Sequence, residues 1–168
     1  SFGEYKENFM PFERDPITLA RKWVKPGTKG MEHRIGGLEK DSISGNISYD
    51  PENHQKMTNL RSQKIKNIQN ELDDININGP EKGDLLVIGW GSTNGPISEA
   101  QDELSKKGLK ISHIQVSCLW PISDNLKEIA SKFESVIVVE MNEGQLYSIL
   151  KAEGITKAQS LTQVSGKP

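Results

Sequence analysis

Apolar and polar positions follow two different periods along the second half of this 168-residue chain. Short continuous apolar runs, bounded by Gly, Pro or charged residues, predict buried strands. The predicted strands cover residues 85–89, 110–116 and 135–140, with a last edge strand over residues 158–164. Segments with apolar residues three and four positions apart predict helices over residues 93–107, 124–133 and 143–153.

Strands that alternate with helices through connections this short predict a parallel sheet with helices on both faces. The second half of the chain is therefore predicted to have an α/β fold. Its expected architecture is a three-layer α/β/α domain with a mostly parallel sheet, preceded by a long loop and a helix.

The first half combines one predicted helix with a long segment that has no regular period. Asp50 and Pro51 open the helix as N-cap and first helical residue. Its apolar stripe consists of Met57, Leu60, Ile65, Ile68 and Leu72. Residues 24–50 are rich in Gly and charge, and ordered loops of this length usually bind something or act as linkers. We expect a division into residues 1–50 and an α/β domain over residues 51–168.

Composition and charge narrow the class of protein. The formal net charge is −2, so the chain lacks the basic footprint of a general nucleic-acid-binding protein. The charge is uneven, because residues 1–70 carry 12 Lys and Arg against 9 Asp and Glu, and the remainder carries 9 against 14. One cysteine excludes a disulfide framework, and no apolar run resembles a membrane span or a signal peptide. We expect a cytoplasmic protein without a membrane partner.

The stretch GWGSTN ends a predicted strand and opens a predicted helix, as a phosphate-binding turn would. A dinucleotide fingerprint needs glycines at its first, third and sixth positions and an acidic residue after the next strand. Gly89 and Gly91 fit, but the sixth position is Asn94, and the next strand ends without an acidic residue. We interpret the turn as a structural corner. The candidates for anion binding through backbone N–H groups are Gly91, Ser92 and Thr93.

Other residues with chemical potential are predicted to have structural roles. His33, His54 and His113 fall on a loop, a helix and a strand, without the spacing of metal ligands. Cys118 is predicted to be a small buried side chain. Glu140 ends an apolar strand, where a carboxylate can serve a site or bind the start of a nearby helix, and we favour the helix. We assign no catalytic residue and no metal ligand.

Several stretches resemble a known family in the same order along the chain. They are PFERDPITLARKWVKPGTKGMEHRIGGLEKDSISGNISYDPENHQKMTNLRSQKI, GWGSTNGPISEA, LWPIS and VVEMNEGQL. This sequence resembles the C-terminal portion of the alpha subunits of 2-oxoacid:ferredoxin oxidoreductases, especially those of the 2-oxoglutarate type. The resemblance extends from about Met10 to Leu150, and its most specific part is the loop GLEKD with GNISYDP.

The resemblance implies a thiamin-diphosphate-dependent enzyme that converts a 2-oxoacid, 2-oxoglutarate or a broad range, to an acyl-coenzyme A and reduces ferredoxin. It implies that residues 1–50 are the tail of a preceding domain with a connecting loop, and that residues 51–168 resemble the transketolase C-terminal domain. The implied partners are the beta subunit, the preceding alpha-subunit domain, ferredoxin and coenzyme A. Thiamin diphosphate, Mg and a 4Fe-4S cluster would belong to the full complex. This chain is expected to bind none of them and to be inactive alone.

The loop of residues 32–46 is the part that we expect nearest the active centre of such a complex. Arg34 and Lys40 are candidates for binding the carboxylate of a 2-oxoacid or a phosphate. Asp41 is a candidate for orienting such a cation or for taking a proton from the substrate side. The opposing interpretation is that Glu39, Lys40 and Asp41 form a solvated charge cluster at a subunit contact.

Two other readings remain open from the sequence. One is the corresponding C-terminal domain of another thiamin enzyme, such as a transketolase relative, although the front loop favours the ferredoxin-linked group. The other is a stand-alone coenzyme- or nucleotide-binding module that uses the turn at residues 89–95. The sequence does not identify the 2-oxoacid or the oligomeric state.

Overall fold

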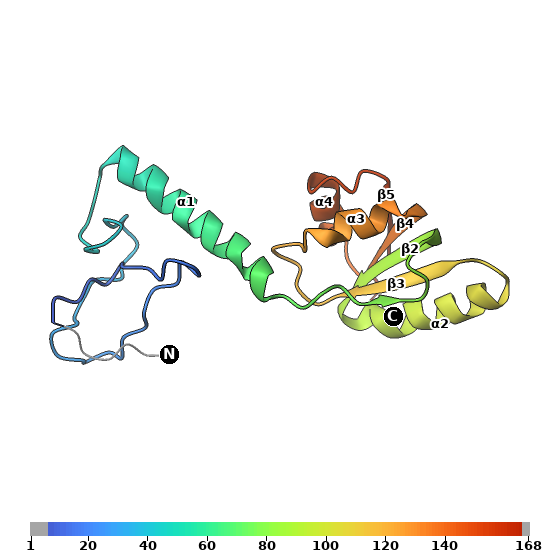
Figure 1. The fold of residues 1–168 in the computed structure, drawn as a ribbon, viewed down its shortest axis with the longest axis horizontal. Coiled ribbons are helices and arrows are strands. Elements are labelled where there is room, and N and C mark those ends of the chain that lie inside the picture. Colours follow the sequence, from blue (N-terminus) through green and yellow to red (C-terminus); the bar gives the residue numbers. More distant parts are fainter. Residues whose placement is uncertain (1–6, 166–168) are drawn as a thin grey trace. The chain divides into compact units, whose positions relative to one another are not determined.

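The computed structural model describes residues 7–165 and divides them into two compact units (Figure 1). The first unit extends to Glu71, and the second begins at Leu72. The first unit therefore includes the long helix that follows residue 50. The reason is that the helix packs on the front loop, through buried Met57 and Asn53.

The first unit contains helix α1 (Pro51–Asn67) and the short 3-10 helix η1 (Ile68–Glu71). The Asp50 carboxylate accepts a hydrogen bond from the Glu52 backbone N–H at 3.0 Å, and Pro51 is the first helical residue, so the predicted start of the helix is confirmed. Of the predicted apolar stripe, Met57 is buried, whereas Ile65 and Ile68 are exposed.

Turns rather than strands hold the remainder of the first unit together. Two isolated antiparallel bridges join Arg14 to Arg21 and Lys40 to Ile47. Among residues 7–71 of this unit, the buried apolar side chains are Phe12, Met31 and Met57. With so few of them, the conformation depends on polar contacts within the loops.

The second unit is built on one mixed, mostly parallel five-stranded sheet with the strand order β1-β3-β2-β4-β5. The strands are β1 (Ile77–Asn78), β2 (Gly83–Trp90), β3 (Ile111–Val116), β4 (Phe133–Glu140) and β5 (Ala158–Thr162). Strand β1 runs antiparallel to β3, and all other neighbours are parallel. In the pair of strands β2 and β4, Leu86 lies beside Val136 and Ile88 lies beside Val138.

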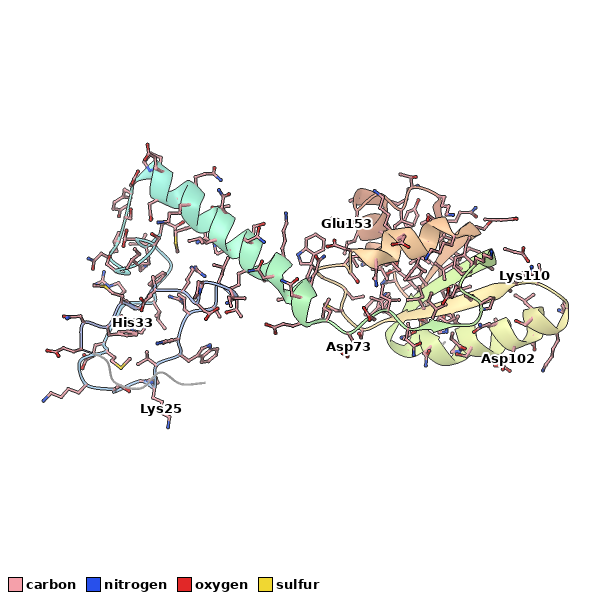
Figure 2. The ribbon with its side chains drawn as sticks, viewed as in Figure 1. Lys25, His33, Asp73, Asp102, Lys110 and Glu153 are labelled. Atoms are coloured by element: carbon pink, nitrogen blue, oxygen red, sulfur yellow. The ribbon has the colours of Figure 1, made fainter. Side chains whose placement is uncertain are left out.

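Helices cover the two faces of this sheet (Figure 1). They are α2 (Asn94–Lys106), α3 (Asn125–Ser131) and α4 (Gln145–Ala152). The side chains of Leu86, Ile88, Val136 and Val138 join Leu126, Leu146 and Leu150 in one buried core beneath α3 and α4. The alternate side chains of the strands point to the opposite face, which α2 covers. The exposed side chains of Asp102, Lys110 and Glu153 mark the surface of this unit (Figure 2).

The predicted α/β fold is confirmed in its order of elements, with two differences. Strand β1 was not predicted, because its two residues obtain their strand conformation only by pairing with β3. The sequence analysis ended a helix at Phe133, whereas in the structure this residue begins β4 and its side chain is buried. In the part of the chain that the structure describes, no helix is long and apolar enough to cross a membrane.

Candidate functional site

Asp41 closes a tight turn inside the loop of residues 32–46. Its carboxylate accepts hydrogen bonds from the Ile43 N–H at 3.1 Å, the Ser44 N–H at 2.8 Å and the Ser44 hydroxyl at 2.8 Å. These bonds, the backbone bond from Ser44 foremost, hold the pKa of Asp41 below its ordinary value. The Oδ1 atom of Asp41 is therefore occupied by its own turn.

Lys40 is buried beside this turn, with 3% of its surface exposed. Its ammonium donates to the Gly36 carbonyl at 2.8 Å and also to the Leu38 carbonyl. The side chain of Asn53, on α1, donates to the Lys40 carbonyl at 2.8 Å and accepts from the Ser42 N–H at 3.1 Å. A buried ammonium needs such partners. Lys40 and Asn53 together fix the path of the loop on the helix.

A second polar contact between loop and helix was not predicted from the sequence. Glu39 contacts His54 Nδ1 at 2.6 Å and accepts from both terminal guanidinium nitrogens of Arg61 at 3.3 Å. The hydrogen bonds from Arg61 and then from His54 lower the pKa of Glu39 to about 2. Glu39 is 15 positions from His54 and 22 positions from Arg61 in the sequence. Only the two residues of the helix could have been placed on one face from their spacing.

Arg34 differs from Lys40 and Asp41 because its side chain is exposed and makes no hydrogen bond or ion pair with any residue in the described range 7–165. Its neighbour Ile35 is 78% exposed. The structure thus places the three predicted residues on one loop, where Lys40 is buried, Asp41 is partly buried and Arg34 is exposed.

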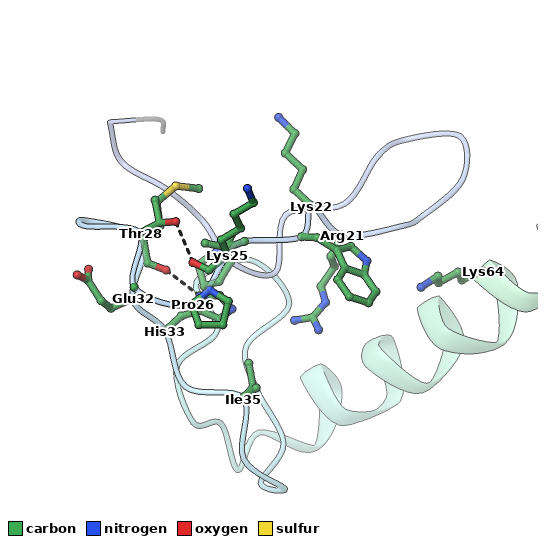
Figure 3. Close-up of a pocket in the computed structure, with 14 residues that line it drawn as sticks. Arg21, Lys22, Lys25, Pro26, Thr28, Glu32, His33, Ile35 and Lys64 are labelled. Carbon is green, nitrogen blue, oxygen red and sulfur yellow. Dashed lines mark hydrogen bonds between the residues drawn. The ribbon is translucent and has the colours of Figure 1, made fainter. Parts of the chain in front are cut away.

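A cavity of about 800 Å³ lies beside this loop and within the first unit (Figure 3). We call it the basic cavity; it is lined by residues 21–28, Met31–His33, Ile35, Pro11 and Lys64. The cations Arg21, Lys22 and Lys25 lie on the segment of residues 21–28, and Lys64 projects from α1 (Figure 3). The sequence analysis did not single out these residues, because Lys64 joins the segment of residues 21–28 in the cavity wall only in the fold.

The glycine turn at the end of β2 is a closely packed corner. A Cβ on Gly89 would lie 2.3 Å from Ile97 Cδ1 and 2.7 Å from Thr93 Oγ1. Gly91 has a φ of +59°, which a glycine adopts without strain. Thr93 Oγ1 accepts from the Trp90 N–H at 3.1 Å and donates to the Trp90 carbonyl at 2.9 Å. Gly91 and Thr93 therefore serve the geometry of the turn, and the Ser92 hydroxyl lies 3.5 Å from Met141 Sδ.

Glu140 lies beside this corner at the carboxyl end of β4 and is 1% exposed. Its carboxylate accepts from the Leu146 and Tyr147 N–H groups, each at 2.9 Å, in the first turn of α4. The prediction that Glu140 binds the start of a helix is confirmed. Trp90 Nε1 and Asn142 Nδ2 donate to the same carboxylate, each at 3.1 Å. A carboxylate so close to the turn does not favour an anion there.

His113 and Cys118 complete the list of predicted structural residues. His113 is buried in β3, and burial lowers its pKa, although the nearby Gln115 side chain acts in the opposite direction. Cys118 is only partly buried, unlike the prediction, because it lies in the connection after β3 with its thiol near the Trp120 carbonyl.

The residues present do not fit the cofactors that the family resemblance implies for the whole enzyme. Within residues 7–165 no group of three or more His, Cys, Asp or Glu side chains could hold a metal ion. One cysteine cannot supply the thiolates of a 4Fe-4S cluster. The Gly-Asp-Gly pattern of thiamin diphosphate sites is also absent, since Gly83-Asp84 continues into Leu85.

The sheet with its preceding helix and loop defines a domain of the ferredoxin-linked 2-oxoacid oxidoreductases. The chain belongs to the family described as pyruvate:ferredoxin oxidoreductase core domain II, whose model matches residues 83–166. The resemblance to alpha subunits of 2-oxoacid:ferredoxin oxidoreductases, noted from the sequence, is thereby confirmed.

Individual relatives are similar over both units of the chain. The 2-oxoglutarate oxidoreductase subunit KorA of Mycobacterium tuberculosis is 42% identical over 99% of this chain and 25% of its own length. The subunit alpha of 2-oxoacid:ferredoxin oxidoreductase 2 of Aeropyrum pernix is 32% identical over 80% of this chain and 22% of its own length. The chain thus spans about a quarter of the length of such relatives.

A solved structure has the same fold. It is the 2-oxoglutarate:ferredoxin oxidoreductase from Magnetococcus marinus with 2-oxoglutarate, coenzyme A and succinyl-CoA bound. The two chains are 28% identical and superpose with a TM-score of 0.88, over 99% of this chain and 29% of that chain.

Proposed function

We propose that this chain is the C-terminal part of the alpha subunit of a thiamin-diphosphate-dependent 2-oxoacid:ferredoxin oxidoreductase. The enzyme would decarboxylate a 2-oxoacid, 2-oxoglutarate or a broad range, to an acyl-coenzyme A and pass the electrons to ferredoxin. The observation that carries the proposal is the 42% identity to a 2-oxoglutarate oxidoreductase subunit over 99% of the chain. The solved relative with 2-oxoglutarate and coenzyme A bound supports the same activity.

Within that enzyme the chain would position and assemble rather than react. Thiamin diphosphate, Mg and the 4Fe-4S cluster would be held by other parts of the complex, which supply the carbanion and redox chemistry. Residues 1–50 would be the tail of the preceding alpha-subunit domain with its connecting loop, and the sheet would correspond to the transketolase C-terminal domain. The partners would be that preceding domain and the beta subunit, with ferredoxin and coenzyme A bound through the complex, in the cytoplasm.

Arg34 is the residue of the loop that we propose to contact an anionic substrate group. Its exposed guanidinium can grip a carboxylate or phosphate with two parallel hydrogen bonds. Lys40 and Asp41 would contribute to the same site by holding the loop, through the carbonyl and turn contacts of their own side chains.

The second candidate, a coenzyme- or nucleotide-binding module at residues 89–95, has less support. Packing of Gly89 against α2 and closure of the turn by Thr93 account for that sequence without a ligand. Gly91, Ser92 and Thr93 would then bind no anion.

Steady-state assay of the whole alpha subunit with its partner subunit tests the proposal. The complex, supplied with coenzyme A, is expected to reduce ferredoxin when given a 2-oxoacid, and comparison of 2-oxoglutarate with pyruvate and branched 2-oxoacids identifies the substrate. The 168-residue chain alone serves as the negative control. Failure of every 2-oxoacid to support ferredoxin reduction would contradict the proposal.

A further inference from the structure

Asn53 is a buried amide that joins α1 to the loop of residues 32–46. Its Nδ2 donates to the Lys40 carbonyl at 2.8 Å, and its Oδ1 accepts from the Ser42 N–H at 3.1 Å. The side chains of all three residues are buried. Asn carries a donor and an acceptor on one planar group, so it can pair with both backbone groups at once. Asn53 therefore fixes the backbone on either side of residue 41 to the helix.

Lys40 extends this anchor to the exposed segment of residues 34–38. Its ammonium donates to the carbonyls of Gly36 and Leu38. Within the described range 7–165, residues 34–38 make no other hydrogen bond. Each of the five residues is exposed, and a Cβ on Gly36 or Gly37 would meet no atom within 4 Å. The position of this segment therefore depends on the Lys40 ammonium.

The other contacts of the loop do not replace Asn53. The turn of Asp41 and the antiparallel bridge between Lys40 and Ile47 join the loop to itself, not to α1. Glu39 does contact α1, but its partners His54 and Arg61 have exposed side chains. Ion pairs with exposed groups contribute little to stability, whereas a buried polar group that loses its partner is costly. Asn53 is therefore the stronger of the two anchors on the helix.

We propose that Asn53 is a positioning residue for Arg34. By holding Lys40 on α1, it keeps the carbonyls of Gly36 and Leu38 in place, and Arg34 lies two residues before the first of them. The inference rests on the proposed contact of Arg34 with an anionic group of the substrate. Asn53 would act only through Arg34, and misplacement of a binding group by about 1 Å can lower a rate about a hundredfold.

The first test measures how firmly the loop is held and needs no turnover. In the full alpha subunit with its partner subunit, Asn53→Asp keeps the acceptor for Ser42 but sets an oxygen against the Lys40 carbonyl. The helix itself is not weakened, because a carboxylate is favourable in the first turn of a helix. Trypsin cleavage after Arg34 is expected to become about tenfold faster, since one buried hydrogen bond is lost.

The matched control is Asn59→Asp, which makes the same chemical change at an exposed position of α1. It is expected to leave the rate of cleavage after Arg34 unchanged. Equal rates of cleavage in the two variants would overturn the proposal.

The second test asks whether Asn53 acts through Arg34. Asn53→Asp is expected to lower kcat/KM for the 2-oxoacid about tenfold to a hundredfold in the otherwise unmodified complex. In a complex that already carries Arg34→Ala, it should have little further effect, because the group that it positions is gone. Effects of the two substitutions that multiply would overturn the proposal and make Asn53 a structural residue.

A second variant serves if Asn53→Asp does not fold. Lys40→Met keeps the backbone contacts of Asn53 and removes only the ammonium that holds Gly36 and Leu38. It is expected to speed cleavage after Arg34 and to show the same dependence on Arg34, and unchanged cleavage would overturn the proposal. If the unmodified complex turns over no 2-oxoacid, the proposed function fails, whereas the cleavage rates still decide whether Asn53 and Lys40 hold the loop.

Discussion

Trp90 and Glu140 connect the carboxyl ends of the two central parallel strands, β2 and β4. The indole Nε1 of Trp90 donates to Glu140 Oε1 at 3.1 Å. The same carboxylate accepts two backbone N–H groups of the first turn of α4. It thus supplies the acceptors that a helix start needs, since the residue before α4 is Gly144, which has no side chain to cap it.

Glu140→Gln is expected to destabilise the second unit by about 1–3 kcal/mol. An amide places a donor where one carboxylate oxygen accepts, so at least one buried N–H loses its acceptor. Trp90→Phe, which keeps the ring but removes one donor, should cost about 1 kcal/mol. Denaturant unfolding measures both, and hydrogen exchange should show α4 opening first in the Glu140 variant. Equal, small effects would mean that the carboxylate is not the anchor of this helix.

Three glycines of one turn should respond differently to alanine. Gly89→Ala forces a methyl against Ile97 and Thr93, and overpacking of this kind costs about 1–3 kcal/mol. Gly91→Ala should cost roughly 1 kcal/mol because of its positive φ, although the space around it is open. Gly95→Ala, in open space and without a positive φ, is the matched control and should be neutral or slightly stabilising. Loss of binding to a phosphate compound at unchanged thermal stability in Gly91→Ala would instead indicate an anion site.

Buried His113 should make the second unit less stable in mild acid. Burial lowers its pKa in the folded state, so the unfolded chain takes up a proton near pH 6.5 that the folded chain resists. The free energy of unfolding is therefore expected to be flat above pH 6.5 and to fall as the pH decreases below it. His113→Leu should flatten this slope, whereas substitution of exposed His33 by Gln should not. Hydrogen exchange of β2 amides between pH 7.5 and 5.5 provides the measurement.

Glu39 should titrate far below an ordinary glutamate. Its pKa of about 2 in the folded chain lies below the ordinary value of 4.5. The stabilisation from this carboxylate is therefore present above pH 4.5 and is lost as the pH falls toward 2. Arg61→Gln is expected to raise the pKa of Glu39 more than His54→Gln does, because Arg61 is the larger cause. NMR titration of the carboxyl carbon decides this, and an ordinary pKa in the unmodified chain would refute the contact.

The sheet could be predicted from the sequence because its central strands are continuous apolar runs and its helices have a clear period. Strand β1 could not, because two residues carry no period and their pairing with β3 is determined by the fold. The turn of Asp41 and Ser44 has the local signature of a side chain that binds its own backbone, and such a signature is readable.

Burial of Lys40 and the pairing of Glu39 with Arg61 were beyond sequence reasoning. Lys40 is buried because carbonyls of Gly36 and Leu38 converge on it, and the sequence does not encode carbonyl directions in any local pattern. The place of Arg21 could not be predicted either, because the cavity that it lines also includes Pro11 and Lys64 from other parts of the chain. The sequence showed that Lys, Asp and Arg residues cluster in this loop, but it did not show which of their side chains face the solvent.

Arg34→Ala in the whole complex is expected to reduce turnover without reducing stability. The Arg34 side chain contacts none of residues 7–165 through a hydrogen bond or ion pair, so its loss should leave the melting temperature of this chain unchanged. Loss of one charge-assisted contact to a substrate anion is worth roughly 1.5–3 kcal/mol, or about a tenfold to a hundredfold decrease in kcat/KM. Asp41→Ala should instead reduce both turnover and stability, because it opens the turn of Ser44. Lys29→Ala, which removes an exposed cation just before this loop, is the control. The measurements are ferredoxin reduction at varied concentrations of 2-oxoacid and of coenzyme A, together with thermal melts. A higher KM for one of the two substrates in Arg34→Ala would identify the anion that Arg34 contacts. Unchanged kinetics for Arg34→Ala would make the loop an element of the interface alone.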